Sequence, residues 1–135
     1  MRYLLDTNVC VDYLTGRYPS VVARLRSASP DEVCTSSIVA AELRYGADRS
    51  RRSKENHAAL ERLFASLDTV DFDAAAAVAY GRIRTQLESS GGPIGSNDML
   101  IAAHALALGL VLVTDNEREL SRVLGLVVVN WRDRA

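Results

Sequence analysis

Residues 110–116 read LVLVTDN, an apolar run of four residues that ends in a threonine, an aspartate and an asparagine. A strand that is apolar on both faces is buried on both faces, which is typical of a central strand in a parallel sheet. The start of the chain repeats the pattern, because the apolar run 3–5 is followed directly by Asp6, Thr7 and Asn8. The two stretches predict strands of one parallel sheet that end in polar and acidic residues.

Strands and helices alternate along the rest of the chain. Three further short strands are expected, at 33–35, 70–72 and 126–129. Helical periodicity and start signals predict the helices between them, at 9–14, 19–25, 37–45, 60–67, 73–87, 96–108 and, as a short polar turn, from 117. This alternation indicates a parallel sheet covered on both faces. We therefore expect an α/β fold, a three-layer sandwich with a central, mostly parallel sheet flanked by helices.

Length and composition narrow the class of protein. A chain of 135 residues with 48% apolar and 24% charged residues predicts one globular domain, 1–135. No apolar run reaches the roughly 18 residues of a membrane span, and the N-terminus lacks an apolar signal region. We therefore expect a cytoplasmic protein that does not bind a membrane. With a net charge of −1 the chain as a whole is not a polycation, which argues against tight nonspecific binding of nucleic acids. Cys10 and Cys34 form no CxxC pair and are expected to be buried thiols.

Two acids directly follow predicted strands. In open parallel sheets the ligand crevice lies beyond the carboxyl ends of the strands, which is where Asp6 and Asp115 are expected. Either residue alone is equally typical of a turn or a helix cap. Their position predicts a crevice with at least two carboxylates.

Two more acids lie on predicted helices. Glu42 has Ile38 one turn before it and Tyr45 one turn after it, so it projects from an apolar face and needs a partner, a proton or a metal. An arginine ion pair is the alternative. Asp98 lies in the first turn of a helix, 99–108, that is apolar nearly all round. A first-turn acid favoured by the helix dipole is the alternative there.

Taken together, the four acids indicate a cation site. Carboxylates that meet at one end of a sheet, with no lysine or arginine in the same motifs, cannot all stay ionised without cations. Oxygen ligands of this kind suit hard divalent ions, Mg²⁺ or Mn²⁺.

Four motifs in this order resemble the motif set of PIN-domain nucleases, and of VapC toxins in particular: LLDTN at 4–8, AAEL at 40–43, GGPIGSND at 91–98 and LVTDN at 112–116. The resemblance covers essentially the whole chain. It implies a Mg²⁺-dependent endoribonuclease toxin with Asp6, Glu42 and Asp98 as core acids. The fourth position falls on Asp115 or on Asn116, with Glu119 nearby, and Thr7 and Asn8 resemble the small polar residues beside the first acid.

The implied chemistry gives each acid a role. The cation offsets the negative field of the carboxylates, orients the phosphate and activates water, which predicts 5′-phosphate and 3′-hydroxyl ends. Asp6 and Asp98 are expected as direct metal ligands, and Glu42 as a ligand through water or as a base. Asp115 is expected to hold a second metal or a coordinated water molecule. If Asp115 points away instead, it would cap the short helix that begins at Glu117.

The resemblance also implies partners: a VapB-like antitoxin that covers the active-site groove, a second copy of the chain, and operator DNA bound only through the antitoxin. Structured RNA, such as tRNA or rRNA loops, is the implied substrate, with translation inhibited as a result. Five arginines are candidates for following an RNA backbone, the alternative being a solvated helix connection: Arg17, Arg44, Arg49, Arg51 and Arg52.

Two other functions compete with the nuclease. A phosphoryl-transfer α/β domain also places an aspartate after a parallel strand. However, a dehalogenase-like phosphatase would require a D-x-D pair and a receiver domain a late lysine, and the single lysine is Lys54. The second competitor is a PIN-like partner-binding domain without catalytic activity.

Overall fold

The computed structural model describes residues 1–92 and 94–132, so Pro93 of the GGPIGSND motif and the last three residues lie outside the described part. A five-stranded sheet forms the centre, with the strand order β3-β2-β1-β4-β5 and every neighbouring pair parallel. The strands are β1 (Tyr3–Leu5), β2 (Val33–Ser36), β3 (Asp68–Val70), β4 (Val111–Val113) and β5 (Val128–Val129). The predicted α/β fold with a parallel sheet is confirmed.

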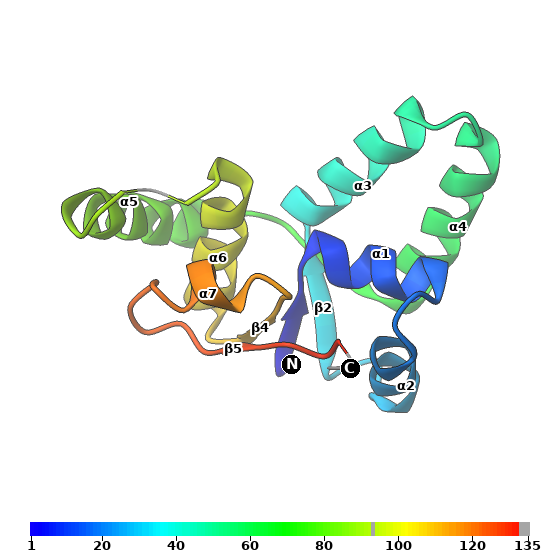
Figure 1. Cartoon of the computed structure of the whole chain (residues 1–135), viewed down its shortest axis with the longest axis horizontal. Coiled ribbons are helices and arrows are strands. Elements are labelled where there is room, and N and C mark those ends of the chain that lie inside the picture. Colours follow the sequence, from blue (N-terminus) through cyan, green and yellow to red (C-terminus); the bar gives the residue numbers. More distant parts are fainter. Residues whose placement is uncertain (93, 133–135) are drawn as a thin grey trace.

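Helices connect the strands and flank the sheet (Figure 1). They are α1 (Thr7–Thr15), α2 (Pro19–Ser27), α3 (Ser37–Arg49), α4 (Ser53–Ser66), α5 (Ala74–Ser89), α6 (Ser96–Leu108) and α7 (Glu117–Leu120). Helices α5 and α6 lie to one side of the carboxyl ends of the strands, and α1, α3 and α4 lie to the other (Figure 1). The carboxyl ends of the strands therefore lie between two groups of helices.

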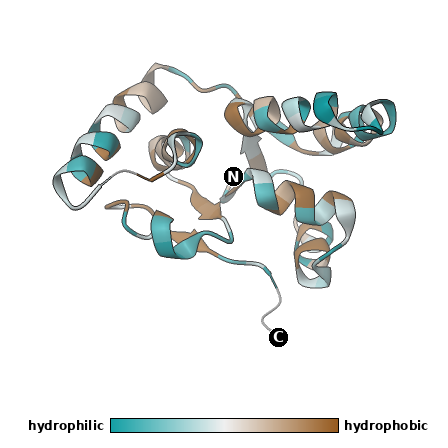
Figure 2. Cartoon of the chain, turned by 45° about the horizontal axis from the view of Figure 1, so that its top comes forward, coloured by the Kyte–Doolittle hydropathy of each residue, from teal (hydrophilic) through white to brown (hydrophobic). Residues whose placement is uncertain are grey.

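The core lies along the central strands and α6, and the ribbon is most apolar toward the middle of the molecule (Figure 2). Leu4 pairs in register with Cys34 and Leu112, and all three side chains are fully buried. Burial on both faces explains why these strands read as continuous apolar runs. The cysteines Cys10 and Cys34 are buried and form no disulfide, as predicted.

His104 in α6 is buried, and its Nδ1 atom lies 2.7 Å from the Ser36 hydroxyl. Burial lowers the pKa of this imidazole. His104 is therefore a hydrogen-bonded residue of the core.

Local signals set the helix ends as expected. Ser36 and Asp73 accept hydrogen bonds from backbone N–H groups in the first turns of α3 and α5. Gly16 and Gly109 end α1 and α6 with φ near +70°, a conformation that glycine adopts without strain.

Some predicted bounds were wrong. The strand expected at 70–72 ends at Val70, because the Phe72 N–H donates to the Ser37 hydroxyl and not to a neighbouring strand. The last strand is confined to 128–129. Within the described residues, no helix combines the length and apolar character needed to cross a bilayer.

The order of the strands determines where a ligand can bind. The chain leaves β1 toward β2 and β3 on one side and returns to β4 and β5 on the other, so the connections reverse direction between β1 and β4. Ligands of open α/β sheets bind in the crevice at such a switch point. Asp6 follows β1 and Asp115 lies two residues past β4, which brings both acids to this crevice.

Candidate active site

Asp6 is the most buried acid at the crevice, with 5% of its surface exposed. It caps α1, since its Oδ1 atom accepts a hydrogen bond of 3.0 Å from the Val9 N–H. Burial raises the pKa of the Asp6 carboxyl to about 7, although hydrogen bonds from Thr114 and Val9 oppose the rise. The negative charges of Asp115 and Asp98 add to it. The fold therefore holds a carboxylate that is costly to ionise without a cation.

Glu42 reaches the crevice from α3 and is half-buried. The Thr7 hydroxyl donates to its Oε1 atom at 2.6 Å, and the Asn97 amide donates to its Oε2 atom at 3.0 Å. No arginine among the described residues forms an ion pair with Glu42, and Arg44 pairs instead with Glu61 at 3.0 Å. The alternative of an arginine ion pair at Glu42 is therefore wrong.

Asp98 lies in the first turn of α6, where its carboxyl is half-buried. Its Oδ2 atom accepts a hydrogen bond of 3.2 Å from the Asn116 amide. Burial raises the pKa of Asp98, against this hydrogen bond, and the charge of Glu42 raises it further. A first-turn acid with a purely helical role would face solvent, whereas Asp98 faces the other acids. Glu119, the further candidate, pairs with Arg122 at 3.0 Å.

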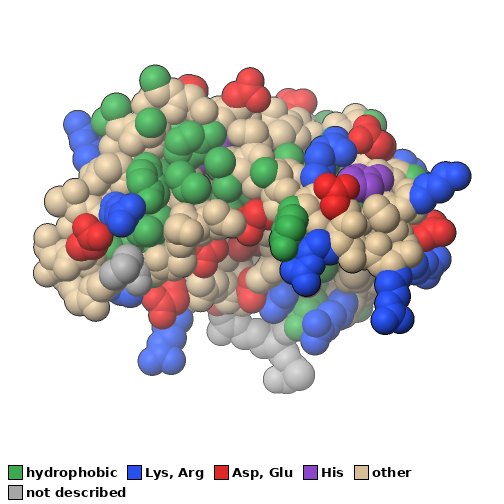
Figure 3. Space-filling view, turned by 90° about the horizontal axis from the view of Figure 1, so that it is seen from above, with side chains coloured by type: hydrophobic (Ala, Val, Ile, Leu, Met, Phe, Trp, Pro, Cys, Tyr) green, Lys and Arg blue, Asp and Glu red, His purple; other side chains and the backbone are tan. Residues whose placement is uncertain are grey.

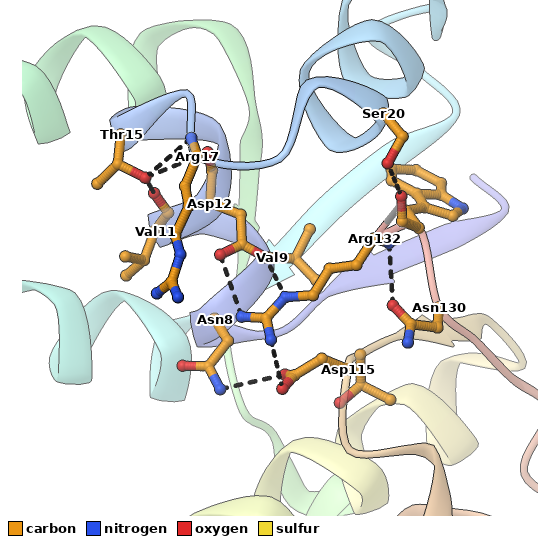
Figure 4. A network of polar contacts seen from close by, with 12 residues as sticks. Asn8, Val9, Val11, Asp12, Thr15, Arg17, Ser20, Asp115, Asn130 and Arg132 are labelled. Carbon is orange, nitrogen blue, oxygen red and sulfur yellow. Dashed lines mark hydrogen bonds and ion pairs between the residues drawn. The ribbon is translucent and has the colours of Figure 1, made fainter. Parts of the chain in front are cut away.

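Asp115 has partners on both oxygens (Figure 4). The Asn8 amide donates to Oδ1 at 3.1 Å, and the Arg132 guanidinium donates to Oδ2 at 3.0 Å. Helix α7 has Asn116 at its N-cap and no side-chain capping bond, so the proposed capping role of Asp115 is wrong. The motifs themselves hold no lysine or arginine, but Arg132 approaches Asp115 from the C-terminal segment.

Hydrogen bonds connect the segments that carry the four acids into one network. Polar residues one or two positions from one acid donate to another: Thr7 and Asn97 to Glu42, Asn8 to Asp115, and Asn116 to Asp98. Acidic side chains gather in the hollow at the middle of this face (Figure 3). Within 1–92 and 94–132, no three acidic, cysteine or histidine side chains are already placed around one point as metal ligands. The oxygen donors fit a hard divalent cation by their chemistry.

Comparison with known proteins identifies the family to which this chain belongs. The model of the PIN-domain family matches residues 3–126. The ribonuclease VapC2 of Rickettsia felis is 41% identical over 97% of this chain and 98% of that protein. The tRNA(fMet)-specific endonuclease VapC of Shigella flexneri is 39% identical over the same shares. The chain belongs to the VapC ribonucleases of the PIN-domain family.

Solved structures agree with this assignment. The DNA-bound VapBC of Salmonella typhimurium contains a chain with a TM-score of 0.91 and 36% identity, covering 97% of this chain and 98% of that one. In VapBC2 of Rickettsia felis, bound to a promoter fragment, the TM-score is 0.88 and the identity 38%, covering 97% and 99%. The predicted family and ribonuclease class are confirmed, and the phosphoryl-transfer alternative is wrong. PIN-domain nucleases generally depend on divalent metal ions.

An apolar groove borders the VapC crevice. It lies between α1, α3 and α4 and has a volume of about 400 Å³. Val11, Leu14, Leu43 and Leu60 line it, with Thr7 and Glu42 among its polar residues. The groove therefore runs up to the acids.

The arginines predicted to follow RNA make local contacts. Arg44 pairs with Glu61 and Arg52 with Glu55, while Arg17 and Arg49 lie over the rings of Tyr18 and Tyr45. Arg51 is exposed. None of these contacts reaches the four acids, although basic side chains do surround the α3–α4 side of the face (Figure 3).

Four residues that contact the acids or their partners were missed from the sequence: Asn97, Thr114, Arg132 and, through Arg132, Asp12. Asn97 and Thr114 carried a signal, since each directly precedes a candidate acid. Arg132 carried none, because it lies outside every motif and contacts Asp115 only through the fold.

Proposed function

We propose that this VapC ribonuclease is a divalent-metal-dependent endoribonuclease toxin. Mg²⁺ is the resident ion and Mn²⁺ can replace it. The active site consists of Asp6, Glu42, Asp98 and Asp115. One observation supports the proposal most strongly: hydrogen bonds connect the four segments that carry these acids at the switch point of the sheet, where the Asp6 carboxyl is buried.

We assign each acid a role from its burial and its hydrogen bonds. A bound divalent cation supplies positive charge that lets the phosphodiester enter an acidic crevice and stabilises the leaving oxygen. Asp6 and Asp98 hold the cation, because these carboxyls have burial-raised pKa values and gain most from a positive charge. Glu42 is oriented by Thr7 and Asn97, and its half-exposed carboxylate accepts a proton from the attacking water.

The substrate is RNA, and the cut falls in an exposed loop of a structured molecule such as tRNA or rRNA. A 39% identical relative carries the name of a tRNA(fMet)-specific endonuclease, which favours tRNA. Arg17, Arg44, Arg49, Arg51 and Arg52 follow the phosphate backbone beside the crevice. Cleavage of such RNA inhibits translation.

The apolar groove is a binding site for a protein partner in this proposal. Related chains were solved as VapBC complexes, two of them bound to DNA. A VapB-like antitoxin with an apolar segment would fill the groove between α1, α3 and α4 and cover Glu42. Operator DNA is then bound through the antitoxin, and the toxin pairs with a second copy of itself.

Incubation of the purified protein with total RNA tests the proposal. We expect internal cuts with 5′-phosphate and 3′-hydroxyl ends in Mg²⁺ or Mn²⁺, and none in EDTA. Sequencing of the fragment ends maps the cuts. Cation binding without any cleavage would favour the non-catalytic alternative, and equal cleavage in EDTA would contradict the metal site.

A further inference from the structure

Arg132 connects the C-terminal segment to the nuclease site (Figure 4). Its Nε and Nη2 atoms donate to the two carboxylate oxygens of Asp12 at 2.7 and 3.1 Å. Its Nη1 atom donates to Oδ2 of Asp115 at 3.0 Å. One guanidinium therefore bridges a structural acid on α1 and an acid of the site.

The segment that carries Arg132 is itself anchored. Trp131 is 5% exposed, and its ring packs edge-to-face on Tyr3 with centroids 5.2 Å apart. The Ser20 hydroxyl donates to the Trp131 carbonyl. The Arg132 guanidinium lies 4.4 Å from the centroid of the Tyr18 ring. These contacts restrict the guanidinium to one position, so the carboxylates it binds are restricted with it.

The bridge has two consequences for Asp115. Arg132 occupies Oδ2 and Asn8 binds Oδ1, so both oxygens of Asp115 have a fixed direction. Arg132 also places a positive charge beside the Asp115 carboxylate, within the acid network. A cation entering the crevice therefore meets an Asp115 whose charge is already partly offset.

We propose that Arg132 is a positioning residue of the nuclease site, which orients Asp115 and offsets its charge. The proposal rests on the proposed function. Asp115 then acts as an orienting carboxylate whose geometry matters for cleavage, and it contributes little to holding the cation. Loss of Arg132 makes the crevice more negative and Asp115 mobile, so cation binding becomes tighter while cleavage becomes slower.

A purely structural clamp predicts something different. Loss of Arg132 weakens the fold in either case, because it leaves Asp12 buried and unpaired. If Arg132 only held the C-terminal segment in place, cation binding and cleavage would decline together, whether or not residue 115 is an aspartate. The two roles differ in whether cation affinity rises or falls when Arg132 is lost, and in whether that change requires Asp115.

The experiment uses the full chain with R132Q, D115N and the double variant R132Q/D115N. Mn²⁺ affinity is measured by calorimetry without RNA, and cleavage is measured at saturating Mn²⁺. We expect R132Q to cut RNA about tenfold more slowly and to bind Mn²⁺ about threefold more tightly. In the D115N background the same change should affect both quantities much less.

Two further variants keep the test decisive. D12N/R132Q removes the buried carboxylate that R132Q leaves without its partner, so it serves if R132Q alone does not fold. R24Q is the matched control, because Arg24 also contacts the segment, over the Trp131 ring at 5.7 Å, without touching Asp115. R24Q should leave Mn²⁺ affinity and cleavage unchanged.

Weaker or unchanged Mn²⁺ binding by R132Q and D12N/R132Q would overturn the proposal. An equal loss of cleavage in the D115N background would do the same. Failure of the wild-type protein to cut RNA in Mn²⁺ would overturn the proposed function instead, which keeps the two failures distinct.

Discussion

The buried carboxyl of Asp6 predicts a stability that depends on pH when no metal is bound. The folded protein holds the Asp6 proton up to a pKa of about 7, whereas the ordinary value is 3.8. Between these values the folded state binds more protons than the unfolded state, so the free energy of unfolding falls as pH rises. The two values give a loss of about 2–3 kcal/mol between pH 5 and pH 8.

Asp6→Asn removes this dependence and nearly keeps the shape of the side chain. The asparagine oxygen still accepts the Val9 N–H that caps α1. In EDTA, we expect the variant to be more stable than the wild-type protein at pH 8, and its advantage to shrink by about 2–3 kcal/mol at pH 5. Urea denaturation at the two pH values measures the difference.

Asp73→Asn is the control for this experiment. Asp73 caps α5 with the same 3.0 Å hydrogen bond, from Ala76, but it is exposed and lies outside the acid network. Its substitution should give the same small difference at both pH values. A pH-independent effect of Asp6→Asn, or a variant less stable than the wild-type protein at pH 8, would refute the reasoning.

Other substitutions separate function from stability. Glu42→Gln should abolish most cleavage and change the free energy of unfolding by less than about 1 kcal/mol, because its partners Thr7 and Asn97 are neutral; a large drop in melting temperature would contradict this. Arg132→Gln should destabilise the fold by about 3 kcal/mol, since it leaves Asp12 buried and unpaired, and adding Asp12→Asn should recover most of the loss in urea denaturation. The isolated protein should be a dimer in light scattering, and a strictly monomeric protein would count against the self-association we propose.

Much of the fold was predictable because local and global signals agree. The runs at 3–5 and 110–113 are apolar on both faces, and both lie at the centre of the parallel sheet. The caps at Asp73 and Gly109 were visible as helix boundaries. The strand expected to include Phe72 was wrong, since its backbone N–H is satisfied by a distant serine that no local pattern reveals.

The site was predictable to the extent that its residues stand beside predicted strands and helix starts. Asp6 and Asp98 follow this rule, and the structure brings both to one crevice. The partners of Asp115 could not be predicted, because Arg132 is 17 residues away in sequence and carries no motif. Long-range ion pairs depend on the tertiary fold, which the periodicity of the sequence does not encode.

The central claim is that the acids at the carboxyl edge of the sheet carry out metal-dependent RNA cleavage. Its most direct test compares RNA cleavage in Mg²⁺ by the wild-type protein, Asp6→Asn, Asp98→Asn and the control Asp31→Asn, an exposed acid outside the network. We predict that the first two variants cut at least about a hundredfold more slowly, while Asp31→Asn cuts at the wild-type rate. Wild-type cleavage by either Asp6→Asn or Asp98→Asn would contradict the account.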